Sequence, residues 1–419
     1  MELELKDGYN RNRNLATAVF PDNNLPLPVD NTLVGKILPP RSRTRSSTAS
    51  RAATRAATKA SLKKRSKSVG KDPNRASLLY HPPSDWSEKN ISDWLNTIAT
   101  ALETVYREEN YGKKLGSYIS LDGTRVDPPK KSWSHKQSGS PLKGSKISRK
   151  PDVILVDSDL KQVVWQNVQG LCEVTRTELP KNTTIKDTIF QKSYIMMTSQ
   201  DNRCFVPSLS FSCDSFTFTV CDRSGAVYSD TQKVKAYPAI LLRIIVGMMF
   251  GRPSTIGYDE TIECDDAGKA TNIIVEGRRY QVQEELFKSK SMRGRATRCW
   301  GVWNGEDEHP VIKDSWVDLR REQNEIETLK YIQAQGLASD KGLPQLVHGE
   351  DVPLPCGGYD SKPICVKDYT SRRRTDDWEE IRVHRRLVMG PKGRHIIAFE
   401  SLKELIGAFI DVVEGSSFR

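Results

Sequence analysis

The sequence lacks any CxxC pair, and no histidine is spaced to complete a zinc site with the eight scattered cysteines. It also lacks a long uncharged apolar run: the longest, residues 239–250, contains Arg243 and falls short of the ~20 residues that cross a bilayer. The opening residues MELELKDGYN carry charge where a secretion signal needs an apolar core. We therefore expect reduced thiols, no structural metal cluster, no membrane partner and an intracellular location, in the nucleus or the cytoplasm.

Acidic residues are absent from one long segment. Residues 31–71 contain 12 of the 64 lysines and arginines, so 52 basic residues remain elsewhere against all 53 acidic ones. The net charge of +11 therefore belongs to a tail, and residues 1–80 are predicted to be disordered. The cluster KKRSK within it has three interpretations: a nuclear address, an arm that binds nucleic acid, or a solvated linker. The mixed-charge stretch 371–386 is typical of a solvated or self-pairing loop, and we assign no phosphate site to it.

An α+β domain is predicted from residue 81 to 255. Apolar residues recur at helical spacing from 84 to 109, and Ser87 or Asp85 can cap that helix. A polar, Lys- and Ser-rich stretch, 127–150, then predicts a disordered insertion. The strands and helices that follow are predicted at 152–157, 171–177, 183–200, 204–213, 215–229 and 239–250.

Two carboxylates are predicted to lie on neighbouring strands of this domain: Asp152 in KPDVILVD and Glu173 in LCEVT. With QKSY in the next helix, the pattern is similar to the restriction-endonuclease-like core, in which an Asp, a Glu and a Lys bind magnesium and position a water. Thr175 stands where that pattern has its lysine, so the resemblance implies a degenerate nuclease. Alternatively, Asp152 lies in a turn and Glu173 at a strand edge. Both residues are weak metal candidates.

The stretch EHPVIKDSW predicts a strand that ends on Lys313, whose ammonium group can bind phosphate. Gly294 lies in a turn upstream, and a glycine lets the backbone approach phosphate closely. Downstream, the helix EQNEIETLKYI offers Glu325 as an ion-pair partner for the lysine. Glu322 and Glu327 compete for this role. An ordinary charged helix face explains the same spacing equally well.

Four stretches occur in a recognisable order: RGRATRCW, VIKDSW, RREQNEIETLK and RVHRRLVMGPKGRHIIAFESLKELIGAFIDVVEG. Their order resembles the fungal-type protein kinase family, a divergent branch of the protein kinase fold. The resemblance runs from about residue 149 to 415. It implies an incomplete kinase N-lobe, with the hinge and the following helix, at 290–415.

The resemblance also implies a nucleotide site. In this site a much-reduced glycine-rich loop runs from Gly294 to Thr297, and Lys313 binds phosphate. Glu325 pairs with the lysine, and Met389 lies near an adenine. ATP with Mg²⁺ is the cofactor implied for the full-length family, and the resemblance fixes none for this chain.

Phosphoryl transfer needs a catalytic Asp from an HRD loop and a metal-binding Asp from a DFG motif. Neither motif occurs in the 419 residues. We therefore expect no catalytic residue, and a pseudokinase truncated before the catalytic loop that binds nucleotide weakly or acts as a scaffold for an unidentified protein. The alternative function is a nucleic-acid-associated protein with a degenerate nuclease-like domain, which binds through the basic tail 31–71.

Overall fold

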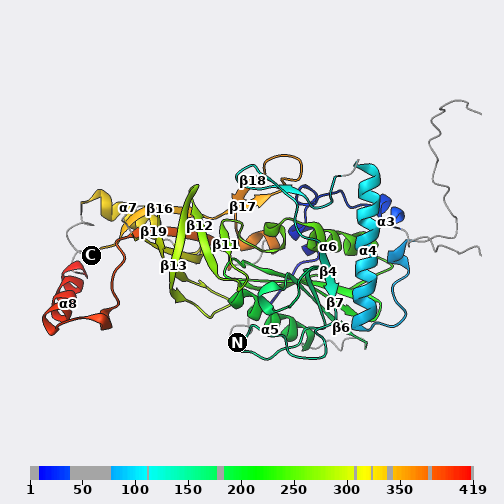
Figure 1. Ribbon diagram of the computed structural model, residues 1–419, viewed down its shortest axis with the longest axis horizontal. Coiled ribbons are helices and arrows are strands. Elements are labelled where there is room, and N and C mark those ends of the chain that lie inside the picture. The colour runs from blue at the N-terminus through cyan, green and yellow to red at the C-terminus, as the bar shows by residue number, and fades with distance from the viewer. Residues whose placement is uncertain are drawn as a thin grey trace, which may run out of the picture.

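The computed structural model describes residues 9–37, 77–110, 113–176, 184–305, 309–321, 324–336, 343–375 and 380–416. Its strands form two large sheets that follow each other along the long axis (Figure 1). Helix α4 (Glu88–Glu109) lies at one end, and α7 (Glu325–Ala334) and α8 (Leu402–Ser416) lie at the other. Helices and mixed sheets together confirm the α+β class.

The first sheet has eight strands in the order β1-β9-β8-β7-β6-β5-β4, with β10 paired to β8. They are β1 (Tyr9–Arg11), β4 (Lys131–Ser134), β5 (Val153–Asp157), β6 (Gly170–Thr175), β7 (Val206–Ser212), β8 (Ser215–Asp222), β9 (Gly225–Tyr228) and β10 (Gln232–Lys233). β6 and β7 are parallel, and α5 (Thr184–Ser199) lies between them in the chain, as a crossover requires. β1 is parallel to β9, and the other neighbours are antiparallel.

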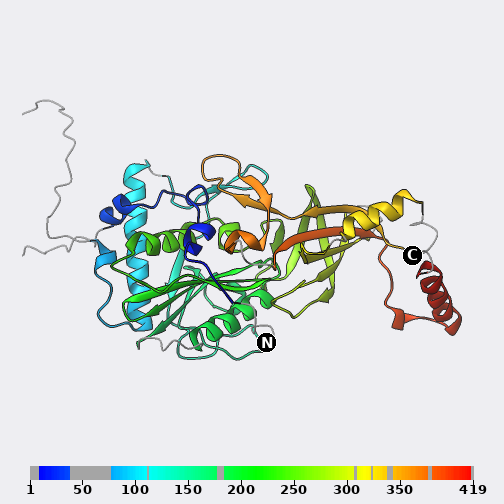
Figure 2. The ribbon, with the colours of Figure 1, turned by 180° about the vertical axis from the view of Figure 1, so that it is seen from behind.

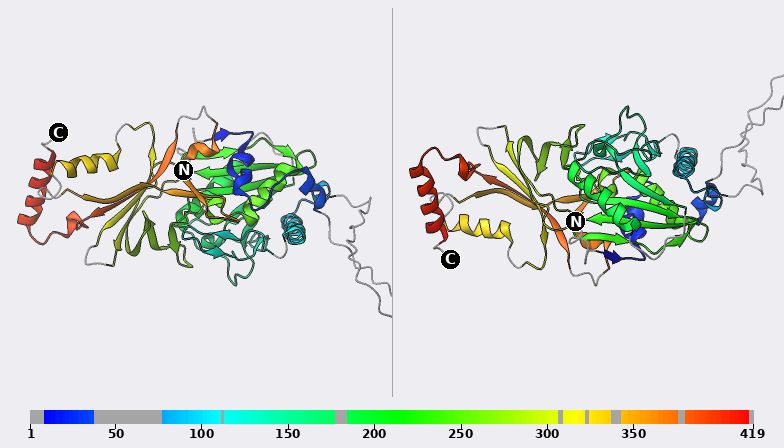
Figure 3. Two further views of the ribbon diagram at one scale, coloured as in Figure 1. Left: turned by 90° about the horizontal axis from the view of Figure 1, so that it is seen from above. Right: turned by 90° about the horizontal axis from the view of Figure 1, so that it is seen from below.

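Helices cover both faces of this sheet (Figure 3). Leu155 of β5 belongs to the core shared with α4 and α6 (Pro238–Phe250), and its neighbour Ile154 belongs to the core shared with α5. Since both faces are covered, β5 is an uninterrupted apolar run. The apolar run at 239–250 is confirmed as a buried helix, α6. Among the described residues, no helix is both long and apolar enough to span a membrane.

Helix α4 is the amphipathic helix that the sequence predicts. The Ser87 hydroxyl accepts the N–H of Asn90 at 3.4 Å, which confirms one of the two predicted caps. The Trp94 ring lies edge-on to Phe211 of β7, with 5.9 Å between ring centroids, so the helix docks on the first sheet. The other buried apolar residues of its inner face are Ile91, Leu95, Ile98, Ala99 and Leu102.

The predicted disordered insertion at 127–150 is wrong, because it contains β4, an edge strand of the first sheet. Trp133 of β4 lies opposite Leu155 of β5 and is almost fully buried. Asn96 of α4 holds it from outside, since the Asn96 side chain bonds both the N–H and the carbonyl of Trp133 at 2.9 Å. The buried indole of Trp133 docks this edge strand. The prediction failed because it used the average composition of the stretch, which its many lysines and serines dominate.

The predicted disordered tail, residues 1–80, is also partly wrong. The start of the chain forms β1, α2 (Leu15–Val19) and α3 (Asn31–Lys36), which pack on the first sheet and on α6 (Figure 2). Phe20 is fully buried, with its ring centroid 5.4 Å from that of Phe218. A Cβ added to Gly247 of α6 would lie 2.3 Å from the Phe20 ring, so this glycine makes room for it. Residues 38–76 lie outside the described residues, and disorder there stays a prediction.

The second sheet has seven antiparallel strands in the order β11-β12-β13-β14-β15-β19-β16. They are β11 (Ile262–Cys264), β12 (Ala270–Val275), β13 (Arg278–Lys288), β14 (Arg298–Trp303), β15 (Val311–Asp318), β16 (Gln345–Asp351) and β19 (Arg382–Gly390). The sheet curls so that the turn after β12 meets the far strand β16. In this turn Glu276 forms hydrogen bonds with His348 and Glu350 at 3.0 and 3.1 Å. Two short pairs, β2 (Tyr118–Ile119) with β3 (Arg125–Val126) and β17 (Pro353–Cys356) with β18 (Ile364–Lys367), lie outside both sheets.

A buried carboxylate connects the first sheet to the arginine-rich stretch. Asp222, at the end of β8, accepts hydrogen bonds from Arg373 at 2.8 Å and Arg374 at 2.5 Å. Burial would raise the pKa of Asp222, but the charges of Arg374 and Arg373 hold it below its usual value. The expectation that this stretch is a solvated face is therefore wrong for these two arginines, which meet a partner about 150 residues away in the chain.

A second buried group is centred on Asp314 of β15. Asp314 accepts hydrogen bonds from His384 and Arg386 of β19, each at 2.5 Å, and Arg386 also donates to Asp259 at 2.7 Å. Burial alone would raise the pKa of Asp314, but the charges of His384 and Arg386 keep it well below its usual range. Because a buried charge is costly without its partner, these pairs fix β15 against β19 and against the segment that leads into β11.

We predict that Phe20→Ala lowers the free energy of unfolding by about 3–5 kcal/mol, since it leaves a cavity between α6 and the first sheet. Urea denaturation of the full chain measures this change. Tyr237→Ala, which truncates an aromatic side chain that is 47% exposed, is the matched control and should stay within about 0.5 kcal/mol of the wild type. Equal stability of the two variants would show that the start of the chain does not belong to the core.

Candidate functional site

Lys313 is the third residue of β15 and lies between β14 and β19, so the prediction that the strand ends on this lysine is wrong: β15 continues to Asp318. The register places Cys299 and Leu387 directly opposite it on the two neighbouring strands, so the three side chains share one face. Lys313 Nζ donates to Glu325 Oε1 at 2.5 Å, and Arg295 Nη2 lies 3.7 Å from Glu325 Oε2. The predicted ion pair is therefore present, and 20% of the lysine side chain remains exposed.

Helix α7 holds Glu325 in place at its first position. Asn324 caps the helix, because its side-chain oxygen accepts the N–H of Ile326 at 3.1 Å. On the inner side of the helix, Ile326 and Leu329 pack against Leu387. The carboxylate is therefore aimed by a capped helix end with an anchored apolar face.

Of the two competing glutamates, Glu327 lies within the described residues and Glu322 does not. Glu327 pairs with Lys330 at 3.3 Å on the exposed side of α7, so it is not the partner of Lys313. Sequence spacing alone left this choice open because all three glutamates fall within one helical turn and a half.

Met389 lies near the end of β19, opposite Val311 of β15. It is two residues beyond Leu387, so it shares the face that carries Lys313. Its side chain is half-buried against the apolar cluster of α7. Met389 therefore lies on the correct face for the role that the family resemblance implies.

The loop between β13 and β14 contains Gly294 in the predicted turn, with a φ of +116° that favours glycine. Its N–H donates to the carbonyl of Arg223 at 2.9 Å, and the Arg223 guanidinium donates to the carbonyl of Ser291 at 3.3 Å. The loop closes where the carbonyl of Thr297 accepts the N–H of Ser289 at 2.9 Å. The loop is thus attached to the turn between β8 and β9, and this bond already uses the Gly294 N–H.

Asp152 and Glu173 of the first sheet form a second cluster with Lys192 of α5. Lys192 Nζ donates to Glu173 Oε2 at 2.5 Å, and both side chains are almost fully buried. Asp152 precedes β5 and accepts the N–H of Val174 at 2.9 Å. Burial and the nearby charge of Asp152 raise the pKa of Glu173 to about 7, although Lys192 opposes the shift.

This cluster changes two interpretations of the sequence. Glu173 does not lie at a sheet edge, because β6 pairs with β5 on one side and β7 on the other. Thr175 offers no amine, and the amine that contacts Glu173 is that of Lys192, the lysine of the QKSY stretch on the crossover helix. The sequence placed QKSY in the next helix, but only the structure shows that this helix brings its lysine, 19 residues away, to the glutamate.

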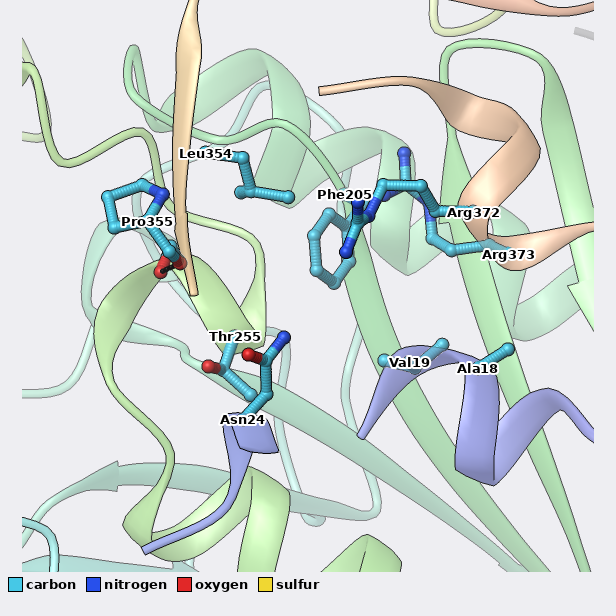
Figure 4. A pocket seen from close by; sticks show the side chains of 10 residues that line it. Ala18, Val19, Asn24, Phe205, Thr255, Leu354, Pro355, Arg372 and Arg373 are labelled. Carbon is cyan, nitrogen blue, oxygen red and sulfur yellow. Dashed lines mark hydrogen bonds between the residues drawn. The ribbon is translucent and has the colours of Figure 1, made fainter. Parts of the chain in front are cut away.

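A small pocket lies where the start of the chain meets the residues around η5 (Thr370–Arg373) (Figure 4). The Arg373 guanidinium lies over the Phe205 ring there, 4.6 Å from its centroid. The pocket is lined in part by Asn24, Phe205, Thr255, Pro355, Arg372 and Arg373. Its lining includes none of the residues predicted to bind nucleotide.

A strand lysine paired with a glutamate of a packed helix, on an antiparallel sheet, is typical of the protein kinase class. A family model described as fungal protein kinase matches residues 150–417, and the chain belongs to this family. The match begins just before β5, so it covers most of the first sheet together with the second. Comparison with curated proteins and with solved structures found no match.

We predict a pH dependence of stability that comes from Glu173. Between its ordinary pKa and about 7 the folded protein keeps a proton that the unfolded chain releases, so stability falls as the pH rises through this window. Relative to Glu173→Gln, the wild type should lose on the order of 2 kcal/mol of unfolding free energy from pH 5 to pH 7. Urea denaturation at several pH values measures the difference, with the exposed Glu108→Gln as control. A constant difference would contradict the raised pKa.

Proposed function

We propose that the second sheet binds an adenine nucleotide through Lys313 and that this chain does not itself transfer phosphate. The ion pair between Lys313 and Glu325 carries the proposal. It neutralises the carboxylate and orients the partly exposed amine on the face of the sheet that α7 partly covers, where a phosphate group can take over one of the amine's hydrogen bonds.

The surroundings of the lysine fit a nucleotide. Arg295, which is partly exposed, adds a second cation next to Glu325. The register places Phe287 of β13 opposite Cys299 and Cys299 opposite Lys313, so an aromatic ring that is 54% exposed shares the face with the amine. Cations for phosphates and an apolar strip for a base therefore occur side by side, and Mg²⁺ would accompany ATP as in the family.

The proposal that this chain does not transfer phosphate is supported by two motifs that its sequence lacks. The sequence has no HRD and no DFG motif, so it offers no base for the attacking hydroxyl and no aspartate for the metal at the expected positions. The only His-Arg pair of the sequence, at His384, lies on β19 and is buried against Asp314. We infer a nucleotide-dependent scaffold whose protein partner is unidentified.

We predict that Lys313→Ala removes the thermal stabilisation of the full chain by ATP with Mg²⁺. At ten times its Kd a ligand stabilises by about 1.4 kcal/mol, which corresponds to roughly 2–4 °C in Tm. Lys330→Ala, on the exposed side of α7, is the control and should keep the full shift. An unchanged shift in Lys313→Ala would show that the lysine does not contact the nucleotide, and no shift in the wild type would refute nucleotide binding.

A second function is favoured by the Asp152, Glu173 and Lys192 cluster. Two carboxylates and an amine converge here from the start of β5, from β6 and from α5. Such groups hold a magnesium ion and position a water for phosphodiester cleavage. The chain would then be a nucleic-acid-associated protein, with the basic tail as its phosphate-binding arm. The raised pKa of Glu173 indicates that the site releases a proton when a cation binds.

We predict that deletion of residues 38–71 abolishes DNA or RNA binding at physiological salt, measured by fluorescence anisotropy. The deletion spares α3 and its buried Leu33 and Val34, which belong to the core. A variant with the same residues in shuffled order keeps the charge and should keep the binding. Cleavage of the bound nucleic acid in Mg²⁺, lost in Glu173→Gln with binding retained, would support the nuclease function, and no binding by the full chain would exclude it.

A further inference from the structure

Three side chains of metal-ligand type meet where the two sheets join. Cys204 lies two residues before the first-sheet strand β7, Asp368 follows β18, and His384 lies on β19 of the second sheet. Their ligand atoms all lie within 4.8 Å of one another, and the three residues are only 2–6% exposed. Cys204 and Asp368 are 164 residues apart and Asp368 and His384 are 16 apart, so no short cysteine or histidine motif in the sequence predicts this cluster.

The His384 ring is held in the orientation that a metal ligand needs. Its Nε2 donates to Asp314 at 2.5 Å, and its plane stacks on Trp316 with 4.6 Å between ring centroids. The other ring nitrogen, Nδ1, lies 4.0 Å from Cys204 Sγ. Metal-binding histidines commonly donate their second N–H to a carboxylate, which fixes the tautomer and the direction of the lone pair.

We propose that Cys204, Asp368 and His384 bind a zinc ion that joins the first sheet to the second. Zn²⁺ is commonly bound by thiolate, imidazole and carboxylate ligands, which are the three groups present here. Three protein ligands leave the fourth tetrahedral position to a water molecule. The distance of 4.0 Å between His384 Nδ1 and Cys204 Sγ exceeds van der Waals contact, and all three ligand atoms lie within 4.8 Å of one another, so an ion can bridge them.

The charge balance of the buried junction permits this ion. Metal binding requires Cys204 as a thiolate and His384 as a neutral imidazole. The thiol proton leaves to solvent, and the Cys204 thiolate and the Asp368 carboxylate then balance the two charges of Zn²⁺. The ion therefore adds no uncompensated charge to the interior.

Two neighbouring arrangements of charged groups compete with this site. Arg373 also contacts Asp368, but at 3.5 Å, which is longer than its bond of 2.8 Å to Asp222, so Asp222 is its main partner. Asp259 and Asp314 also lie near His384, yet Arg386 already bonds both carboxylates at 2.7 and 2.5 Å. That second group is an ion-pair network, and the cluster of Cys204 is the one left to a metal.

The test is the zinc content of the full chain, purified after expression with added zinc and measured by mass spectrometry. We expect about one zinc per chain in the wild type, as for a site with three protein ligands and a water molecule. Cys204→Ala and Asp368→Asn should each lose most of it. Cys221→Ala, which truncates a fully buried thiol of β8, is the matched control and should keep the zinc.

A second set of measurements includes tests on the wild type alone, which do not depend on how well the variants fold. Cobalt added to the metal-free wild type should produce a thiolate-to-cobalt charge-transfer band, and a chelator should lower the Tm of the zinc-loaded protein. The proposal is overturned if the wild type binds neither metal, or if Cys204→Ala and the wild type show the same cobalt band. Neither result depends on nucleotide binding, so failure here leaves the proposed function standing.

Discussion

The pairing of buried carboxylates with arginines from distant parts of the chain is the constraint on which the rest of the structure depends. Asp222 binds Arg373 and Arg374, and Asp314 binds Arg386, with every one of these side chains nearly removed from water. A charge in this environment is tolerated only with its partner, and loss of one partner typically costs about 3–5 kcal/mol. The pairs therefore select one arrangement of the two sheets over others that would bury the same apolar surface.

This arrangement connects the two candidate functional regions. Asp314, which is held by His384 and Arg386, is the neighbour of Lys313 on β15, so the strand that presents the lysine is fixed from its buried side. The loop with Gly294 is attached to the first sheet through Arg223. The family match spans both sheets, so the region that matches the kinase family includes most of the first sheet as well as the second.

Several features could be read from the sequence because they depend on nearby residues. The face of α4, its Ser87 cap, the apolar helix α6 and the strand with Lys313 all follow from local periodicity and turn chemistry. Spacing alone did not distinguish Glu325 from Glu322 and Glu327 as the partner of Lys313, and the family resemblance was needed to select Glu325. The folded segments within 1–80 and 127–150 were missed, because a few buried side chains such as Phe20 and Trp133 anchor otherwise polar sequence, and composition averages them away.

The sequence by itself determined the family and those elements whose apolar pattern is strong, such as α4, α6 and β15, since these patterns repeat within about one or two helical turns. Only the tertiary structure decided which distant groups meet: Lys192 with Glu173, Arg374 with Asp222, and His384 with Cys204. The physical reason is that strand order and register control these encounters. Burial then amplifies their electrostatic consequences, and no spacing rule along the chain encodes either one.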